Sequence, residues 1–329
     1  MKLPLHYLRT AKYYLQGKWR AAKLPAGVVA NARGKVVLAY HGIDYTNDTS
    51  VNTKFRGQKY FEEEIKLLSQ FTNIISLNDY VNDNIDPGKL NVAITFDDGF
   101  LNNYQLAKPV LEKYKAPATF FITPIWQQGK DILWPDLVDH TLSYAPDTLN
   151  VAGEVYSRDI FGRYFHYSGL PIRQHIIRQN RSFIDELYRV LTPYTKFKAN
   201  SSMDIYWKLM GEEHLRELAA NPLFTIGAHS CTHTNLCNID DKEALAELSN
   251  SKQILESVIQ KEVSFFAAPF GGYNDATIEL TRKAGYKYNV LADLHDSKYE
   301  TDAGIIPRLI TNPYLSPAHQ LLFIANKKY

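Results

Sequence analysis

Residues 91–96 form an apolar, β-prone run that ends abruptly in two adjacent carboxylates, Asp97 and Asp98, followed by Gly99. This pattern predicts a buried strand that the glycine terminates in a turn. Neighbouring side chains at a strand end point in different directions, so the two aspartates can take different roles. One could ligate a metal ion while the other stays free as a base. The alternative is an ordinary turn, since Asp and Gly are also common turn residues.

A second stretch, residues 224–233, favours the chemical interpretation. It is another short β-prone run, and it ends in two histidines, His229 and His233, at positions i and i+4. If the chain turns into a helix at His229, this spacing puts both imidazoles on one face. Two neutral imidazoles and one carboxylate form a three-ligand, zinc-type site with an open position for water. The alternative is a pair of unrelated surface histidines.

These two stretches resemble the polysaccharide deacetylases with a NodB-type domain, also called carbohydrate esterase family 4. The family's Thr-Phe-Asp-Asp-Gly motif matches residues 95–99, and its His-Ser-x-x-His motif matches residues 229–233. The resemblance implies that the first aspartate, Asp97, is the catalytic base. It also implies that Asp98 and the two histidines hold the metal.

A third stretch, residues 265–274, looks like the family's Arg-x-Pro-Tyr-Gly segment, with two departures. Phe270 stands where the family has a tyrosine whose backbone N–H contributes to the oxyanion hole, and Phe270 can do this equally well. Ala267 stands where many members have an arginine that orients the base. Our candidate for the missing guanidinium is Arg308, and a surface or structural arginine is the alternative.

Members of the family also have a histidine after a strand, which acts as the general acid towards the leaving amine. No Leu-x-His occurs near the C-terminus here, but residues 36–43 form a buried-strand pattern that delivers His41 into a Gly turn. Some members that resemble the poly-N-acetylglucosamine deacetylases are circularly permuted, with this strand first. We therefore assign His41 as the candidate acid. A structural role at the strand end is the alternative, and His295 is the fallback acid.

The chain alternates strands and helices on both sides of a long interruption. Strands are expected at residues 36–41, 91–96, 118–122 and 224–228, around Ala267, and near residues 288–291 and 305–310. Repeated β-α units argue for a parallel sheet, open or closed into a barrel. The resemblance implies an α/β fold, a distorted (β/α)7 TIM-like barrel, formed by residues 36–124 and 223–329.

Residues 125–222 interrupt this rhythm and contain no family motif. We expect a mainly helical insertion near the active-site mouth, with helices at residues 171–191 and 204–220. Its four histidines have no partner at metal-ligand spacing and are expected to be structural: His140, His166, His175 and His214.

Residues 1–35 carry Lys and Arg but no acidic side chain, and their apolar residues recur at helical spacing, which predicts a basic amphipathic helix. Residues 1–23 resemble a membrane-surface anchor that would seat Trp19 at the interface. A helix packed on the domain is the alternative. There is no apolar region typical of a secretory signal peptide and no membrane-spanning run. We therefore expect a cytoplasmic protein, with peripheral contact at the inner membrane face.

The net charge of +2 implies no general affinity for polyanions, and no nucleic-acid motif is present. Two cysteines, Cys231 and Cys237, do not make a disulfide framework. We expect a metal-dependent hydrolase that removes N-acetyl groups from an amino-sugar glycan or carrier-linked sugar, using Zn²⁺ or another divalent ion such as Co²⁺ or Ni²⁺. Two alternatives stay open. One is a carbohydrate-binding protein of the same fold that has lost catalysis, and the other is a metal-dependent amidohydrolase that acts on a non-sugar amide.

Overall fold

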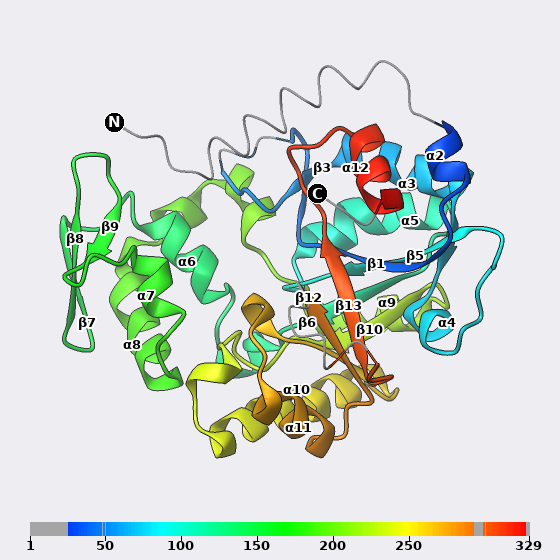
Figure 1. The fold of residues 1–329 in the computed structure, drawn as a ribbon. Helices are drawn as coiled ribbons and strands as arrows, with labels where there is room; N and C mark the ends of the chain where they lie inside the picture. The colour runs from blue at the N-terminus through cyan, green and yellow to red at the C-terminus, as the bar shows by residue number, and fades with distance from the viewer. Residues whose placement is uncertain (1–25, 48, 50, 293–298, 300, 327–329) are drawn as a thin grey trace.

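The structure, a computed structural model, describes residues 26–47, 49, 51–292, 299 and 301–326 (Figure 1). The predicted membrane contact through residues 1–23 lies outside the described residues, and so does the fallback acid His295. Within the described ranges, no helix is long and apolar enough to cross a bilayer.

Seven parallel strands close into a barrel, which confirms the predicted fold class. Around the ring, the order is β1 (Gly34–Tyr40), β13 (Ile305–Ile310), β12 (Tyr288–Ala292), β11 (Phe265–Ala267), β10 (Phe224–Ala228), β6 (Ala118–Ile122) and β5 (Leu90–Phe96). The ring closes because β5 pairs with β1 along its whole length. An eighth strand, β4 (Asn73–Ile75), pairs with the first half of β5, and β6 pairs with its second half.

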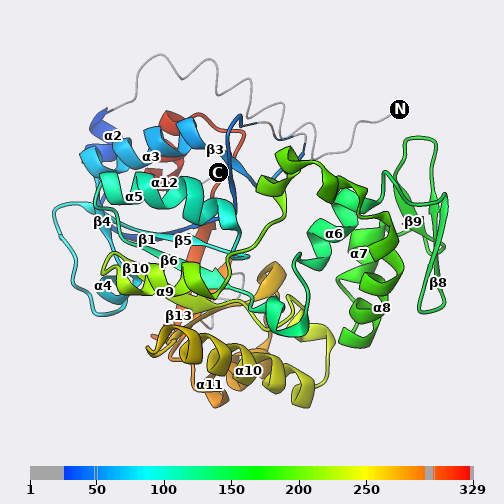
Figure 2. The ribbon, with the colours of Figure 1, turned by 180° about the vertical axis from the view of Figure 1, so that it is seen from behind.

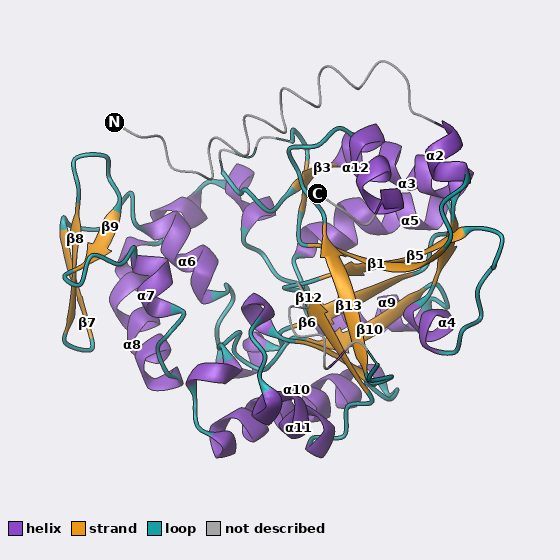
Figure 3. Ribbon diagram, in the orientation of Figure 1, coloured by secondary structure: helices purple, strands orange, loops and turns teal. Residues whose placement is uncertain are grey.

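Helices cover the outside of this barrel (Figure 3). They are α2 (Ala26–Ala30), α3 (Gln58–Phe71), α4 (Leu77–Val81), α5 (Lys108–Lys113), α9 (Glu212–Ala220), α10 (Asp241–Ile259), α11 (Asp275–Lys283) and α12 (Pro317–Asn326). In α3, Phe61, Ile65 and Leu68 recur at helical spacing and are buried in the main hydrophobic cluster. All seven residues of β5 are buried as well, as a strand covered on both faces requires.

Short elements complete the described chain. They are β2 (Ile43–Asp44), β3 (Arg56–Gly57), the π-helical turn η1 (Asn103–Ala107), and the 3₁₀ turns η2 (Ile125–Gln128), η3 (Thr192–Tyr194), η4 (Lys196–Ala199), η5 (Ser201–Tyr206), η6 (Leu236–Asn238) and η7 (Pro269–Gly271).

Residues 125–207 form a lobe with a hydrophobic cluster of its own, beside the barrel (Figures 1 and 2). Its main elements are α6 (Trp134–Thr141), β7 (Thr148–Val151), β8 (Glu154–Arg158), β9 (Tyr164–His166), α7 (Ile172–Ile176) and α8 (Arg181–Leu191). The three strands form an antiparallel sheet, for which the sequence gives no expectation. We refer to this segment as the insertion lobe.

The two helices expected in this region are each interrupted, so their predicted extents were wrong. In place of one helix over residues 171–191, the chain forms α7 and α8, and Asn180 caps the second by accepting a hydrogen bond from a backbone N–H. In place of one helix over residues 204–220, η5 precedes α9. Between these two, Leu209 pairs with Phe100 in a β-bridge, and this contact with a distant segment overrides the local helical pattern.

Strand β10 contains a glycine at a point where no larger residue fits. A Cβ atom added to Gly227 would lie 2.5 Å from two ring carbons of Phe121 and 3.2 Å from the carbonyl oxygen of Phe265. We expect Gly227→Ala to lower the free energy of unfolding by about 1–3 kcal/mol through overpacking. Urea denaturation measures this change. Gly211→Ala is the matched control, because its nearest neighbouring atom lies 3.9 Å away. Equal losses in the two variants would contradict this packing explanation.

Candidate active site

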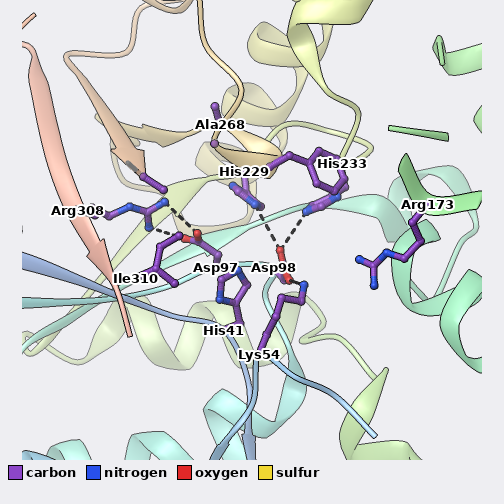
Figure 4. A pocket seen from close by; sticks show the side chains of 13 residues that line it. His41, Lys54, Asp97, Asp98, Arg173, His229, His233, Ala268, Arg308 and Ile310 are labelled. Carbon is purple, nitrogen blue, oxygen red and sulfur yellow. Dashed lines mark hydrogen bonds and ion pairs between the residues drawn. The ribbon is translucent and has the colours of Figure 1, made fainter. Parts of the chain in front are cut away.

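A pocket of about 370 Å³ lies where β1, β5 and β10 end (Figure 4). Its charged and polar lining consists of His41, Lys54, Asp97, Asp98, Arg173, His229, His233 and Arg308. Phe270 lines it as well. The structure therefore brings together all the site residues expected from the sequence that lie in its described ranges; His295 lies outside them. Convergence at the carboxyl ends of parallel strands is typical of active sites in barrel enzymes.

The first aspartate, Asp97, forms a buried, two-pronged ion pair with Arg308. Nη1 of Arg308 lies 2.7 Å from Oδ1 of Asp97, and Nη2 lies 2.9 Å from Oδ2. Nη1 also donates to the hydroxyl of Thr95 at 3.1 Å. The guanidinium beside Asp97 therefore comes from Arg308 on β13. Position 267, at the end of β11, holds an alanine and cannot supply one.

This ion pair determines the protonation state of Asp97. Burial by itself would raise the pKa of the carboxyl group, but the charge of Arg308 and its hydrogen bonds outweigh burial, so the pKa lies below its usual value. Asp97 is therefore ionised at neutral pH. Each carboxylate oxygen has a second lone pair, so the ion pair leaves Asp97 able to accept a proton.

The second aspartate, Asp98, faces the two histidines. Its Oδ1 lies 3.0 Å from Nε2 of His233 and 3.4 Å from Nε2 of His229 (Figure 4). Two ligand atoms that each lie about 2.1 Å from one zinc ion, at an angle of about 90–110°, are about 3.0–3.4 Å apart. Asp98 therefore already lies at the distance from each histidine that a shared metal ion requires, and the three side chains are buried together.

The tautomer of His229 supports the same conclusion. Its Nδ1 lies 2.7 Å from the carbonyl oxygen of Ala267, and a carbonyl only accepts, so Nδ1 carries the proton. A neutral His229 then presents an Nε2 lone pair, rather than an N–H, to the carboxylate of Asp98. Two electron-rich atoms in this position repel each other unless a proton or a metal ion lies between them. The donor set therefore fits a divalent metal ion.

The chain does not turn into a helix at His229, contrary to the arrangement that the i, i+4 spacing indicated. Residues 229–233 form a loop in which Ser230 and His233 both have a φ angle of 59°. The hydroxyl of Ser230 accepts a hydrogen bond from the backbone N–H of His233 at 3.0 Å. A tight loop, rather than one face of a helix, therefore brings both imidazoles to Asp98.

A buried carboxylate on α10, Glu247, holds this loop in place. Its Oε2 accepts hydrogen bonds from the backbone N–H groups of Cys231 and Thr232, each at 2.9 Å, and its Oε1 accepts one from the hydroxyl of Thr232. Arg181 of the insertion lobe pairs with Glu247 at 3.3 Å. Glu247 belongs to no sequence motif. The only sequence feature that could have indicated its role is that this acidic residue lies on the apolar, buried face of α10.

Lys54 is a second site residue that no motif marks. It precedes β3, and its Nζ lies 3.2 Å from Oδ2 of Asp98. Burial by itself would raise the pKa of Asp98, but the charge of Lys54, with smaller contributions from the neighbouring histidines, brings it well below its usual value. Burial lowers the pKa of Lys54, but Asp98 and Asp136 together outweigh burial, so the pKa lies above its usual value. The ammonium group therefore stays charged and balances part of the acidic charge.

His41 and Phe270 complete the set of expected residues. His41 lies at the end of β1, close to the two aspartates (Figure 4). Burial, and then the charge of Lys54, lower the pKa of His41 to about 4, although the aspartates act in the opposite direction. The imidazole is therefore neutral at neutral pH. The ring of Phe270 packs edge-on against His233, with ring centroids 4.7 Å apart.

Strained backbone is concentrated at this site. Of the nine non-glycine residues with positive φ in the described chain, four belong to the site: Asp98, Ser230, His233 and Phe270. Such conformations cost about 1–3 kcal/mol each and persist only where surrounding contacts hold them. This concentration indicates a geometry that is maintained for function.

A second group of potential ligands occurs in the insertion lobe, where Glu154, His166 and His175 lie together. The two histidines therefore do have close potential co-ligands, which corrects the expectation that they have none. Each of their ring nitrogens, however, already has a hydrogen-bond partner within the lobe. The two imidazoles are also stacked, with centroids 3.8 Å apart, so their in-plane lone pairs do not converge on one point. This group therefore fits a structural network better than a metal site.

Comparison with known proteins identifies the family of this fold. The family model for polysaccharide deacetylase matches residues 84–146 and 179–289. YxkH of Bacillus subtilis (strain 168), which carries the name of the same family, is 21% identical over 284 residues, covering 85% of this chain and 72% of its own. Both His41 and Arg308 lie outside the matched residues, so their assignment depends on the geometry.

Two solved structures show the same fold. The Streptococcus pyogenes deacetylase PplD, in complex with acetate, has a TM-score of 0.58 at 16% identity, covering 89% of this chain and 99% of that chain. IcaB from Ammonifex degensii has a TM-score of 0.55 at 19% identity, covering 90% of this chain and 98% of that chain.

The contacts of Glu247 lead to a prediction about metal binding. Glu247→Gln keeps one oxygen for the two backbone N–H groups, but it replaces the oxygen that accepts from the hydroxyl of Thr232 with an NH₂ group. It also removes the charge of one of the two carboxylates that pair with Arg181. We expect it to weaken Zn²⁺ binding by about 10–100-fold, as measured by competition with a chromophoric chelator. Glu243→Gln, on the same helix, is the matched control. Unchanged affinity in Glu247→Gln, or an equal loss in the control, would contradict the role of Glu247.

Proposed function

The chain belongs to the polysaccharide deacetylase family, and we propose that it removes N-acetyl groups from an amino-sugar glycan or a carrier-linked amino sugar by metal-dependent hydrolysis. One observation carries the proposal. Asp98 and two histidines, a donor set for a metal ion, lie beside an ionised Asp97 that Arg308 holds in place. Metal-assisted amide hydrolysis uses a cation for the carbonyl oxygen and a base for the attacking water, side by side.

Asp98, His229 and His233 would hold the ion. Nitrogen and carboxylate donors of this kind suit Zn²⁺, and Co²⁺ or Ni²⁺ could replace it. When bound, the ion supplies a Lewis acid that polarises the acetyl carbonyl and makes water more acidic.

The chain's own residues carry out the remaining steps. Asp97 removes a proton from the attacking water, and Arg308 keeps its carboxylate ionised and oriented. The backbone N–H of Phe270 donates to the negative charge that develops on the acetyl oxygen. His41 protonates the departing amine. Because the pKa of His41 is about 4, this residue must take up a proton during the reaction before it can act as an acid. Asp97, which removes a proton from water, lines the same pocket and is the source of that proton.

The absence of an arginine at position 267 motivates the alternative of a binding protein without catalysis. Arg308 supplies a guanidinium to Asp97 from another strand, which weighs against that alternative. The amidohydrolase alternative differs in its substrate, so acetate release from acetamido sugars distinguishes it. The cytoplasmic location and the membrane contact through residues 1–23 stay predictions from the sequence.

Asp97→Asn tests the assignment of the base. The amide has no basic site for a proton, so we expect acetate release from N-acetylhexosamine oligomers to fall by about 10²–10⁴-fold. Metal content, measured on the same preparations, should stay at the wild-type level, because Asp97 is not a ligand. A variant that binds metal and keeps wild-type turnover would contradict the assignment.

Arg308→Met tests the electrostatic role of the ion pair. In the wild type, Arg308 is the largest influence that lowers the pKa of Asp97 against the effect of burial. Without it, the pKa of Asp97 rises, so the base becomes protonated and inactive at a higher pH. We therefore expect the acid limb of the kcat/KM profile to move to higher pH.

Arg308→Lys keeps the charge and should shift the profile less. Circular dichroism checks the fold of both variants, because a buried carboxylate without its partner destabilises a protein by about 3–5 kcal/mol. A folded Arg308→Met variant with the wild-type acid limb would contradict this role.

A further inference from the structure

The pocket contains one more cation than the proposed chemistry uses. Lys54 and Arg308 each face an aspartate, at 3.2 Å and 2.7 Å. Arg173 also lines the pocket, but it contacts neither the base nor the metal ligands. The role of Arg173 is therefore not explained by the hydrolysis step.

Arg173 comes from α7 of the insertion lobe and points into the pocket from the side opposite Arg308 (Figure 4). Its Nη1 pairs with Asp139 of α6. Within the part of the chain that the structure describes, this is the one hydrogen bond of the guanidinium. The side chain is 36% exposed. Asp139 therefore tethers Arg173 by one nitrogen, and Nη2 and Nε remain able to donate.

A substrate that fills the pocket would cover this guanidinium. Removal of a cation from water is strongly unfavourable unless a partner compensates for it, and Asp139 satisfies one nitrogen only. A carboxylate or a phosphate can accept two parallel hydrogen bonds from a guanidinium, and these bonds are about twice as strong as bonds to neutral groups. The hydroxyls of a neutral sugar would compensate less well.

We propose that Arg173 recognises an acidic group on the substrate, so that the preferred substrate is an acetamido sugar that carries a carboxylate or a phosphate. This inference rests on the proposed function, because it names the substrate class of the same site. The pocket volume of about 370 Å³ lies at the small end of the range for ligand pockets, about 300–1,000 Å³. The acidic group therefore belongs to the sugar that loses its acetyl group, or to the linkage next to it.

Binding to Zn²⁺-loaded Asp97→Asn protein tests the inference without turnover. The probes are N-acetylglucosamine, which is neutral, N-acetylmuramic acid, which carries a carboxylate, and N-acetylglucosamine 1-phosphate. We expect one of the acidic probes to bind at least about tenfold more tightly than the neutral one, and Arg173→Gln to remove this advantage. The acidic probe whose binding weakens in Arg173→Gln shows whether Arg173 recognises a carboxylate or a phosphate on the substrate.

Two further variants serve as controls in the same background. Arg178→Gln removes an exposed arginine of the same segment that does not line the pocket, and it should bind as the parent does. Asp139→Asn removes the counter-charge from Arg173, and it should keep or increase the preference for the acidic probe. Equal binding of neutral and acidic probes, or an acidic preference that survives in Arg173→Gln, would overturn the inference.

The two proposals fail in different ways. If the wild-type protein releases acetate from N-acetylglucosamine at least as fast as from both acidic probes, the acidic-substrate inference is overturned and the deacetylase function stands. If acidic sugars bind through Arg173 but no probe releases acetate, the deacetylase function is overturned and the acidic subsite stands.

Discussion

Two buried carboxylates that are adjacent in the sequence can both stay charged only if each has its own cation, because burial strongly disfavours an unpaired charge. Asp97 has Arg308, and Asp98 has Lys54 and the two histidines that suit a metal ion. This separation gives the two aspartates different chemistry. Asp97 stays an ionised base, whereas Asp98 becomes part of a cation site.

The rest of the molecule holds these charges in place. The closed barrel brings β5, β10 and β13 to one pocket, and Glu247 holds the loop that carries the metal histidines. The insertion lobe contributes to the same loop, because Arg181 pairs with Glu247 and the indole N–H of Trp134 donates to the carbonyl oxygen of His233 at 2.9 Å. A lobe outside the barrel therefore both stabilises the candidate metal site and, through Arg173, lines the pocket.

The sequence predicts the parts of this arrangement that depend on local pattern. The barrel strands are continuous apolar runs, since a parallel strand is buried on both faces, and the short motifs identify the aspartates and histidines. Glu247 and Lys54 were not predictable, because their roles arise from contacts between segments far apart in the chain. The prediction of a helix at His229 was wrong for the same reason. The backbone N–H groups of this loop donate to Glu247, and the i, i+4 spacing of the two histidines contains no information about that distant acceptor. The antiparallel sheet of the insertion lobe lies in a region without motifs.

The measurement that tests the central claim most directly is a titration of chelator-stripped protein with Zn²⁺, in which bound metal and acetate release are followed together, with an Asp98→Ala variant beside the wild type. We predict that the wild type releases acetate in proportion to bound metal, that both reach saturation at one ion per chain, and that Asp98→Ala shows neither. Acetate release by the stripped protein at the full rate, or one bound ion per chain without release from any neutral or acidic acetamido sugar, would contradict the claim that this site is a metal-dependent deacetylase centre.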